Sequence, residues 1–171
     1  MPSRTARPSG QALYTADQRL RRDASHWTLV QGILAPLQFV VFLVSLALVL
    51  RYLGTGAGFE AATLSIIVKT LVLYTIMVTG ALWERDVFGQ YLFAAPFFWE
   101  DVVSFVVIAL HTYYLYAILT GALAPREQML IALAAYAVYV VNAAQFLLKL
   151  RAARLQAAAS MRQSGGLELA S

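Results

Sequence analysis

The sequence predicts an all-α protein, an integral membrane four-helix bundle with a short N-terminal amphipathic helix. Hydrophobic residues make up 60% of the 171 residues and charged residues only 13%, and the mean hydropathy is +0.66. Soluble domains contain about 45–50% apolar residues. Four apolar runs lie at 27–50, 62–83, 102–120 and 128–148, and each has the roughly 20 residues that a helix needs to cross a bilayer. Because the bilayer offers no water to hydrogen-bond the backbone, we expect each run to form a helix, whose backbone groups bond one another. We expect the four helices to form one domain over residues 13–155.

The segments at either end of this domain have a different composition. Residues 1–12 are rich in Pro, Ser and Arg and are predicted to be disordered. In "YTADQRLRRD", Thr15 and Gln18 have the spacing of a capping box, which predicts a short amphipathic helix on the membrane surface with its arginines near anionic headgroups. Residues 156–171 are rich in Ala, Gln, Gly and Ser and are predicted to form a flexible tail.

Glycine and proline mark the connections between the spans. "GTGAG" at 54–58 predicts a short loop between the first two spans. Pro125 has the position of a first-turn proline and predicts the start of the fourth span. The middle loop, "ERDVFGQYLFAAP", is expected to fold partly over the mouth of the bundle.

Positive charge is concentrated on one side of the predicted membrane. Only Arg51 and Arg126 fall in the two loops of the other side. The ten cations on the favoured side are Arg4, Arg7, Arg19, Arg21, Arg22, Arg85, Lys149, Arg151, Arg154 and Arg162. By the positive-inside rule, both termini and the middle loop are expected in the cytoplasm.

This distribution explains the net charge of +4 as a topology signal, so we expect no nucleic-acid partner. The absence of cysteine excludes disulfides, thiolate metal sites and cysteine nucleophiles. The chain also lacks a nucleotide-binding glycine motif, and we expect no cofactor.

Polar residues inside the spans form two depth layers when the helical rise is applied. The layer near the cytoplasmic side contains Gln31, Glu84, Glu100, Asp101, Ser104, Asn142 and Gln145. The deeper layer contains Gln38, Lys69 and His111. Because every span contributes, the layers predict a pocket that opens toward the cytoplasm. Ionisable groups are expensive at such depth, and this favours a functional interior.

Helical phase refines these layers. Glu100, Ser104 and His111 lie along one face of the third span, whereas Asp101 points to a different side. A structural interpretation stays open for each group. Asn142 and Gln145 also suit interhelical hydrogen bonds, and a lysine at the depth of Lys69 also suits snorkelling to the surface. A single intramembrane histidine is often a hydrogen-bonded core residue, and two acids at a helix start are favoured by the helix dipole.

Three segments carry a resemblance to a known family. "RRDASHWTLVQGILAPLQFVVFLVSLALVLRYL", "FFWEDVVS" and "YVVNAAQFLLKLRAARL" resemble the 3-vinyl bacteriochlorophyllide hydratase family of bacteriochlorophyll biosynthesis, over about residues 13–155. The resemblance implies a hydro-lyase that converts the C3 vinyl group of a magnesium chlorophyllide or bacteriochlorophyllide into a 1-hydroxyethyl group. It also implies a bacterial inner or intracytoplasmic photosynthetic membrane, with membrane lipid and neighbouring pigment-biosynthesis enzymes as partners.

Hydration of such a vinyl group requires a proton donor, a held water molecule and groups that stabilise the cation beside the ring. We expect Glu100 to be the general acid, with Asp101 or Glu84 holding or deprotonating the water. His111 is the expected axial ligand of the substrate's magnesium. The other residues expected to contact the substrate or its water are Lys69, Ser104, Asn142, Gln145, Gln31 and Gln38. Cations near the membrane surface, namely Arg22, Arg85 and Lys149, are expected near the substrate's propionate.

The main alternative is a non-catalytic (bacterio)chlorophyll-binding assembly factor or carrier, which His111 would suit equally well. The adjacent carboxyl groups favour catalysis, because a carrier has little use for a buried acid. A haem- or quinone-handling subunit is disfavoured, since such haem proteins usually pair histidines across helices, whereas His26 lies at the interface and His111 stands alone.

Overall fold

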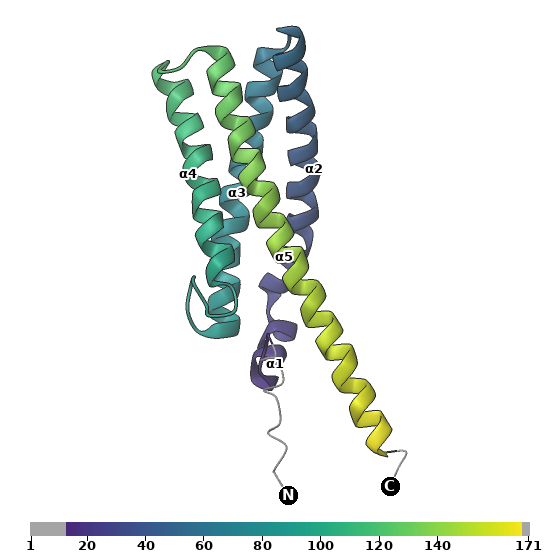
Figure 1. Ribbon diagram of the computed structural model, residues 1–171. Helices are drawn as coiled ribbons and strands as arrows, with labels where there is room; N and C mark the ends of the chain where they lie inside the picture. The colour runs from purple at the N-terminus through teal and green to yellow at the C-terminus, as the bar shows by residue number, and fades with distance from the viewer. Residues whose placement is uncertain (1–12, 169–171) are drawn as a thin grey trace, which may run out of the picture.

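The computed structural model describes residues 13–168, with α5 side chains described as far as Leu155 and at Ala158 (Figure 1). The described chain is helical, and its five helices are α1 (Ala16–Ala24), α2 (His26–Thr55), α3 (Phe59–Phe88), α4 (Phe98–Thr120) and α5 (Pro125–Glu168). The last four are long and apolar enough to cross a membrane. They confirm the predicted fold class of a membrane helical bundle.

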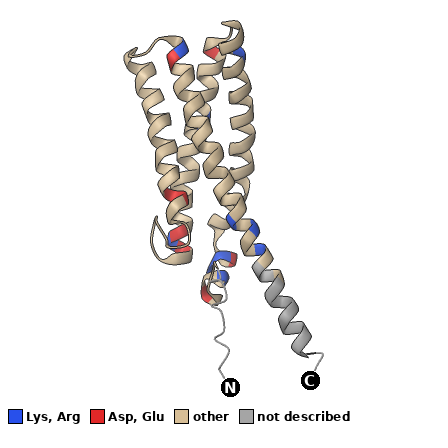
Figure 2. Cartoon of the chain, in the orientation of Figure 1, with Lys and Arg blue, Asp and Glu red and all other residues tan. Residues whose placement is uncertain are grey.

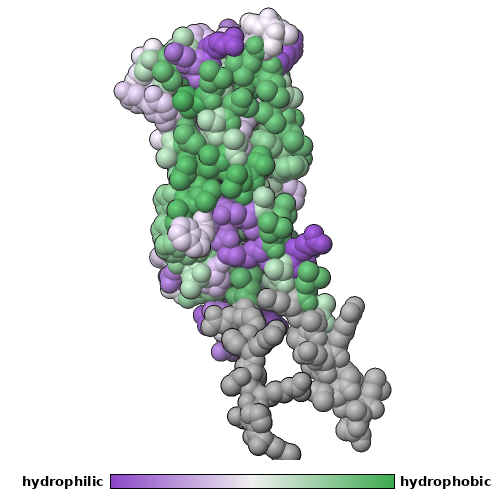
Figure 3. Space-filling model, viewed as in Figure 1, coloured by the Kyte–Doolittle hydropathy of each residue, from purple (hydrophilic) through white to green (hydrophobic). Residues whose placement is uncertain are grey.

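The four long helices pack chiefly as two antiparallel hairpins, α2 with α3 and α4 with α5. The seams α2–α5 and α3–α4 close the bundle. Helix α1 and the C-terminal half of α5 lie at one end, called the α1 end below, and the short α2–α3 and α4–α5 turns lie at the other (Figure 1). Charged residues gather toward these two ends (Figure 2), and apolar surface covers most of the face between them (Figure 3).

The observed helix ends have local causes. Gly56 and Gly89 end α2 and α3 with φ of 74° and 83°, a left-handed conformation that glycine adopts without a Cβ clash. Their amides donate to carbonyl oxygens one turn back, over 2.7 Å and 2.9 Å. Helix α5 begins at Pro125, where a missing amide hydrogen costs nothing.

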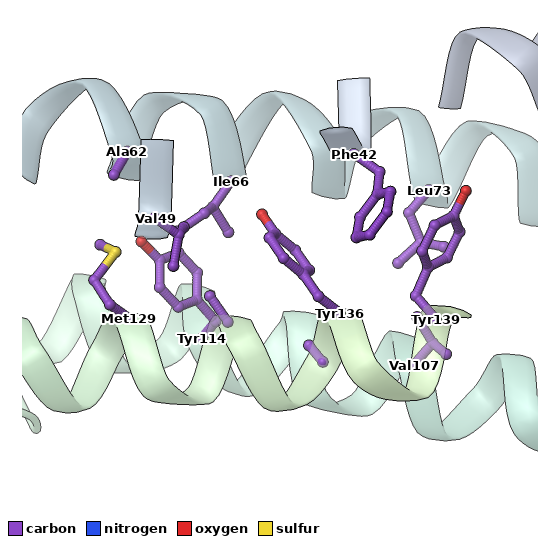
Figure 4. Packing of buried hydrophobic residues seen from close by; sticks show 12 residues of the cluster. Phe42, Val49, Ala62, Ile66, Leu73, Val107, Tyr114, Met129, Tyr136 and Tyr139 are labelled. Atoms are coloured by element: carbon purple, nitrogen blue, oxygen red, sulfur yellow. The ribbon is translucent and has the colours of Figure 1, made fainter. Parts of the chain in front are cut away.

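Aromatic packing and hydroxyl hydrogen bonds hold the centre of the bundle (Figure 4). The Phe42 ring lies 5.4 Å from the Tyr136 ring and 4.9 Å from the Tyr139 ring. The Tyr136 hydroxyl is 2.5 Å from Ser45 Oγ, which is 2.7 Å from Ser65 Oγ. Lipid tails are as apolar as this core, so close packing and interhelical hydrogen bonds, rather than the hydrophobic effect, fix the arrangement.

Helix α1 is docked against the end of α3. The predicted capping box is present, because the Gln18 amide donates to Thr15 Oγ1 (3.2 Å) and the Thr15 amide donates to Gln18 Oε1 (2.9 Å). The Tyr14 ring stacks on Phe88 at 5.9 Å and is only 5% exposed. Burial raises the pKa of the Tyr14 phenol, and the neighbouring Arg22 partly opposes this.

Two expectations concern the chain ends. Residues 1–12, predicted to be disordered, lie outside the described residues. The backbone of 156–168, predicted as part of a flexible tail, continues α5 instead. Its alanine-rich composition explains this difference, since alanine has the highest helix propensity.

Candidate active site

Three buried carboxyl groups lie together at the α1 end. Glu84 belongs to the last turns of α3, and Glu100 and Asp101 to the first turn of α4. Their exposed fractions are 5%, 5% and 4%. Figure 2 shows acidic residues at this end of the α3–α4 pair. The sequence placed these residues in one layer, and the structure brings them together as an acid cluster, defined by these three residues.

Glu100 is held by α5. Its Oε2 accepts from Lys149 Nζ at 2.5 Å, and the Glu100 side chain is 7% exposed while that of Lys149 is 25% exposed. Lys149 also donates to the carbonyl oxygen of Pro96. The Asn142 amide donates to the Glu100 carbonyl oxygen (2.8 Å) and to Ser104 Oγ (3.1 Å). Ser104 and Asn142 therefore join α4 to α5 beside this ion pair.

Glu84 and Asp101 form a second unit, called the acid couple. Asp101 Oδ2 accepts the backbone amide of Phe93 at 2.7 Å, and Glu84 Oε2 accepts that of Ala94 at 3.1 Å. Because the two amides belong to consecutive residues of one loop, the two carboxyl groups lie next to each other. Among the described residues, neither forms an ion pair of its own. Neighbouring carboxyl groups held out of solvent repel each other when both are ionised, so such an arrangement favours one proton for the two.

The loop from Gly89 to Phe97 lies over the acid couple, to which it donates the amides of Phe93 and Ala94. The predicted middle loop began at Glu84, but residues 84–88 form the last turns of α3. Phe97 anchors it, with 3% exposure and ring contacts to Trp83 (5.6 Å) and Phe146 (6.0 Å). Phe93 has a positive φ of 59°, and its ring stacks on Phe105 at 5.4 Å. The acid couple thus holds the loop by its backbone while aromatic rings hold it from outside.

The deeper layer is a separate, fully buried unit. Lys69 Nζ lies 3.0 Å from His111 Nε2, and both residues are 0% exposed. His111 Nδ1 lies 2.8 Å from the carbonyl oxygen of Val107, so Nδ1 carries the hydrogen and Nε2 accepts from Lys69. Lys69 Nζ also lies 4.2 Å from the centre of the Tyr139 ring, a cation–π distance.

This geometry bears on two expectations. Lys69 points into the bundle and does not snorkel to the surface. His111 Nε2, the atom that would bind magnesium, is engaged by Lys69, so ligation requires Lys69 to release it. Magnesium ligation by His111 stays a prediction.

The glutamines of the two layers differ in their contacts. Gln31 donates to Thr79 Oγ1 at 2.7 Å and to the Ile76 carbonyl oxygen at 3.3 Å, joining α2 to α3. Gln38 is 2% exposed, and neither atom of its amide has a partner among the described residues. Gln145 Oε1 is likewise unpaired within that part of the chain. Buried polar atoms usually have partners, so these two side chains are available to a water molecule or ligand.

The pocket that is expected to open to the cytoplasm stays a prediction. Among residues 13–168, one open hollow of about 260 Å³ adjoins Tyr52 and Arg126 near the opposite end, and another of about 510 Å³ runs along α5 from Leu147 to Leu155. Neither is lined by the acid cluster, whose three residues are 4–5% exposed.

Sequence reasoning missed one group beside the site, the exposed aromatic side chains of the loop and of α4. These are Phe93, Phe98, Trp99 and Phe105. A usable signal was present in "FFWEDVVSF", where Phe98 and Phe105 flank Asp101 at helical spacings of three and four residues.

The fold and the site together define a class of protein. Four apolar helices embed the chain in a membrane, and a carboxyl couple shielded from solvent lies where two of them meet. This is a polytopic membrane protein with a buried acid cluster near one end of its helical bundle.

Comparison with known proteins identifies the family. The chain belongs to the 2-vinyl bacteriochlorophyllide hydratase family, which it matches over residues 14–152. It is 68% identical to the 2-vinyl bacteriochlorophyllide hydratase of Rhodobacter capsulatus over 158 residues, 92% of each chain. It is 71% identical to the protein of that name from Cereibacter sphaeroides over 144 residues, 84% of this chain and 89% of the relative. The names 2-vinyl and 3-vinyl differ only in ring numbering, so the resemblance noted in the sequence is confirmed. No solved structure matches the chain.

Proposed function

We propose that this chain adds water to the vinyl group of a bacteriochlorophyllide or chlorophyllide, forming a 1-hydroxyethyl group during bacteriochlorophyll biosynthesis. The names of its relatives support the reaction and the substrate class. The acid couple, two buried carboxyl groups held side by side by the amides of Phe93 and Ala94, is the observation that carries the chemistry.

Two carboxyl groups that share one proton supply both halves of a hydration. The protonated member donates its proton to the terminal carbon of the vinyl group, which becomes a methyl group. Positive charge then develops on the carbon next to the ring, where the macrocycle spreads it, and the ionised member stabilises it. The water oxygen attacks this carbon, and its surplus proton passes to the ionised carboxylate.

This sequence is balanced. One water molecule is consumed, and the couple ends with the single proton that it held at the start, now on the other member. A proton shift between Glu84 and Asp101 restores the initial state. No external acid, base, oxidant or reductant enters the cycle.

We place proton transfer on the acid couple rather than on Glu100, the donor expected from the sequence. The Glu100 carboxylate is engaged by the Lys149 ammonium at 2.5 Å, a charge-assisted contact that holds the side chain in place. Glu100 and Lys149 then position α4 against α5 and contribute fixed charges beside the couple. Glu100→Gln should therefore reduce the hydration rate less than Glu84→Gln.

The expected orientation supports the same reaction. With both termini in the cytoplasm, the acid cluster lies near the cytoplasmic membrane surface. The propionate of the substrate can then remain in the headgroup region, near Arg22 or Arg85, since Lys149 is engaged by Glu100. Its apolar macrocycle remains in the bilayer.

The test is incubation of membranes containing this chain with the vinyl pigment, followed by mass spectrometry of the extracted pigment. We expect a gain of one water mass per pigment, and almost none with the Glu84→Gln, Asp101→Asn double variant. Pigment that binds and leaves unchanged would refute the proposal and favour the carrier function.

A further inference from the structure

Four aromatic side chains form an exposed group on the loop and the outer side of α4. Phe93, Phe98, Trp99 and Phe105 are 39%, 44%, 68% and 42% exposed. The Phe93 ring lies 5.7 Å from Phe98, and Phe98 lies 5.4 Å from Trp99. Phe93 also stacks on Phe105, with 10° between the ring planes. The three residues of α4, namely Phe98, Trp99 and Phe105, are called the aromatic platform.

The platform adjoins the acid couple. Asp101 follows Phe98 by three residues and precedes Phe105 by four, so Phe98 and Phe105 border Asp101 on the helix surface. Phe93 covers this point in two ways. Its ring lies on Phe105, and its backbone amide donates to Asp101 Oδ2. A molecule that took the place of the Phe93 ring would therefore lie on Phe105, one helical turn from the Asp101 carboxyl group.

The backbone conformation of Phe93 is a second, independent sign that this residue has a special role. Its φ of 59° is the one positive φ of a non-glycine residue within 13–168. For a bulky side chain this region is strained, and such strain persists where surrounding contacts impose it, often at functional sites. The conformation marks Phe93 as a residue held by its surroundings, namely the hydrogen bond to Asp101 and the stack on Phe105.

We infer that the aromatic platform is the docking surface for the flat conjugated macrocycle of the substrate, which arrives sideways from the bilayer and takes the place of the Phe93 ring. The inference rests on the proposed function and adds the binding site to it. The Phe93 ring stacks nearly parallel on Phe105, so a planar π-system in its place can stack on Phe105 in the same way. Phe98 and Trp99, whose rings stand at 86° to each other, offer edge contacts beside it. Lateral access also explains how a membrane-dissolved ring reaches acids that are only 4–5% exposed.

The alternative role for exposed aromatic residues is anchoring at the membrane interface. Helix α4 offers a matched control for that role. Tyr113 and Tyr116 are 44% and 56% exposed and stack on each other at 6.3 Å, several turns from the acid couple. If exposed aromatic residues only anchor the helix, loss of a platform residue and loss of Tyr116 should have similar effects on pigment binding. If the platform is the docking surface, only loss of a platform residue should weaken pigment binding.

The experiment compares Phe105→Leu and Trp99→Leu with Tyr116→Leu in full-length protein in lipid nanodiscs. Leucine keeps an apolar group at the membrane surface and removes the ring. Pigment dissociation constants come from absorption titration with the vinyl pigment, and KM and kcat from the mass gain. We expect each platform variant to raise Kd and KM about threefold to tenfold, as the loss of an aromatic pair predicts. Tyr116→Leu should leave both unchanged.

Phe93→Gly gives a prediction of opposite sign. Glycine keeps the amide that donates to Asp101, accepts the positive φ and removes the ring that competes with the macrocycle. We expect this variant to bind the pigment more tightly than the parent.

The possible outcomes separate the two proposals. Unchanged Kd and KM in Phe105→Leu and Trp99→Leu, or equal losses in Tyr116→Leu, would overturn the docking surface even if the parent hydrates the pigment. A parent that binds pigment through the platform without changing its mass would refute the hydratase proposal and leave the docking surface standing.

Discussion

The Asp101→Asn exchange separates the chemistry of the acid couple from its role in the fold. Asp101 Oδ2 accepts the Phe93 amide at 2.7 Å, and the oxygen of an asparagine amide can accept the same hydrogen bond. The covering loop should therefore keep its anchor. An amide neither donates a proton to carbon nor takes one from water at neutral pH, so the shared proton is lost.

The expected loss of rate follows from the catalytic role of Asp101, and the expected loss of stability from its role as an anchor of the loop. General acid–base catalysis contributes typically about 10²–10⁴-fold, so we expect Asp101→Asn to lower kcat at least about a hundredfold. Glu84→Gln should have a comparable effect, and the double variant should lose little more than either single one, because both groups act in one step. Asp101→Ala removes the buried acceptor as well, and leaving the Phe93 amide unpaired should cost a further 1–3 kcal/mol or so of stability.

The assay measures single-turnover conversion of the vinyl pigment in nanodiscs, alongside hydrogen exchange of residues 89–97. Asp101→Asn should show parent-like protection of the loop and a greatly reduced rate, whereas Asp101→Ala should lose both. A hydration rate close to that of the parent in Asp101→Asn and in Glu84→Gln would refute the proton-sharing mechanism. Loss of rate only where loop protection is lost would assign these acids a purely structural role.

Three further predictions concern other parts of the molecule. Lys149→Met leaves the buried Glu100 carboxylate without its partner, and removing one member of a buried ion pair costs about 3–5 kcal/mol of stability. Because the Lys149 side chain is 25% exposed, we expect a loss at the lower end of that range. Thermal unfolding in detergent measures the loss, and an unchanged melting temperature would contradict this prediction. Lys69→Met frees His111 Nε2, so the magnesium pigment should bind more tightly relative to its metal-free form; equal affinities before and after would argue against ligation by His111. The chain has no cysteine, so single cysteines can be introduced to report its orientation. A membrane-impermeant thiol reagent should label Ala57→Cys from the periplasmic side and Ala24→Cys only after the membrane is opened. The reverse labelling pattern would contradict the proposed orientation.

Much of the fold was accessible from the sequence because its causes are local. Hydropathy located four spans, and the capping box of Thr15 and Gln18 marked α1. The common depth of Glu84 and Asp101 followed from helical rise alone, since both lie near the α3–α4 connection. These features depend on residue spacing within one segment, which the sequence displays directly.

The partners of the charged groups were not accessible in the same way. The Glu100–Lys149 pair and the Lys69–His111 pair join residues 49 and 42 positions apart. Their formation depends on the rotation and tilt of α3, α4 and α5 about their axes, which depth and phase leave undetermined. Lys149 was assigned to the propionate of the substrate for this reason, and its contact with Glu100 was missed.

The aromatic platform was missed for a related reason. Phe98, Trp99 and Phe105 fit an interfacial belt as well as a docking surface when only the sequence is known. The distinction required knowing that α4 packs against α3 and α5, which leaves this face free. It also required the position of Phe93, whose positive φ no propensity predicts.

The most direct test of the acid couple is hydration of the vinyl pigment in heavy water. If Glu84 and Asp101 carry the transferred proton, the product made by the parent should contain one deuterium in its new methyl group and the oxygen of solvent water in its hydroxyl group. Neither Glu84→Gln nor Asp101→Asn should form this product at an appreciable rate. Labelled product appearing at the parental rate in both variants would contradict the assignment.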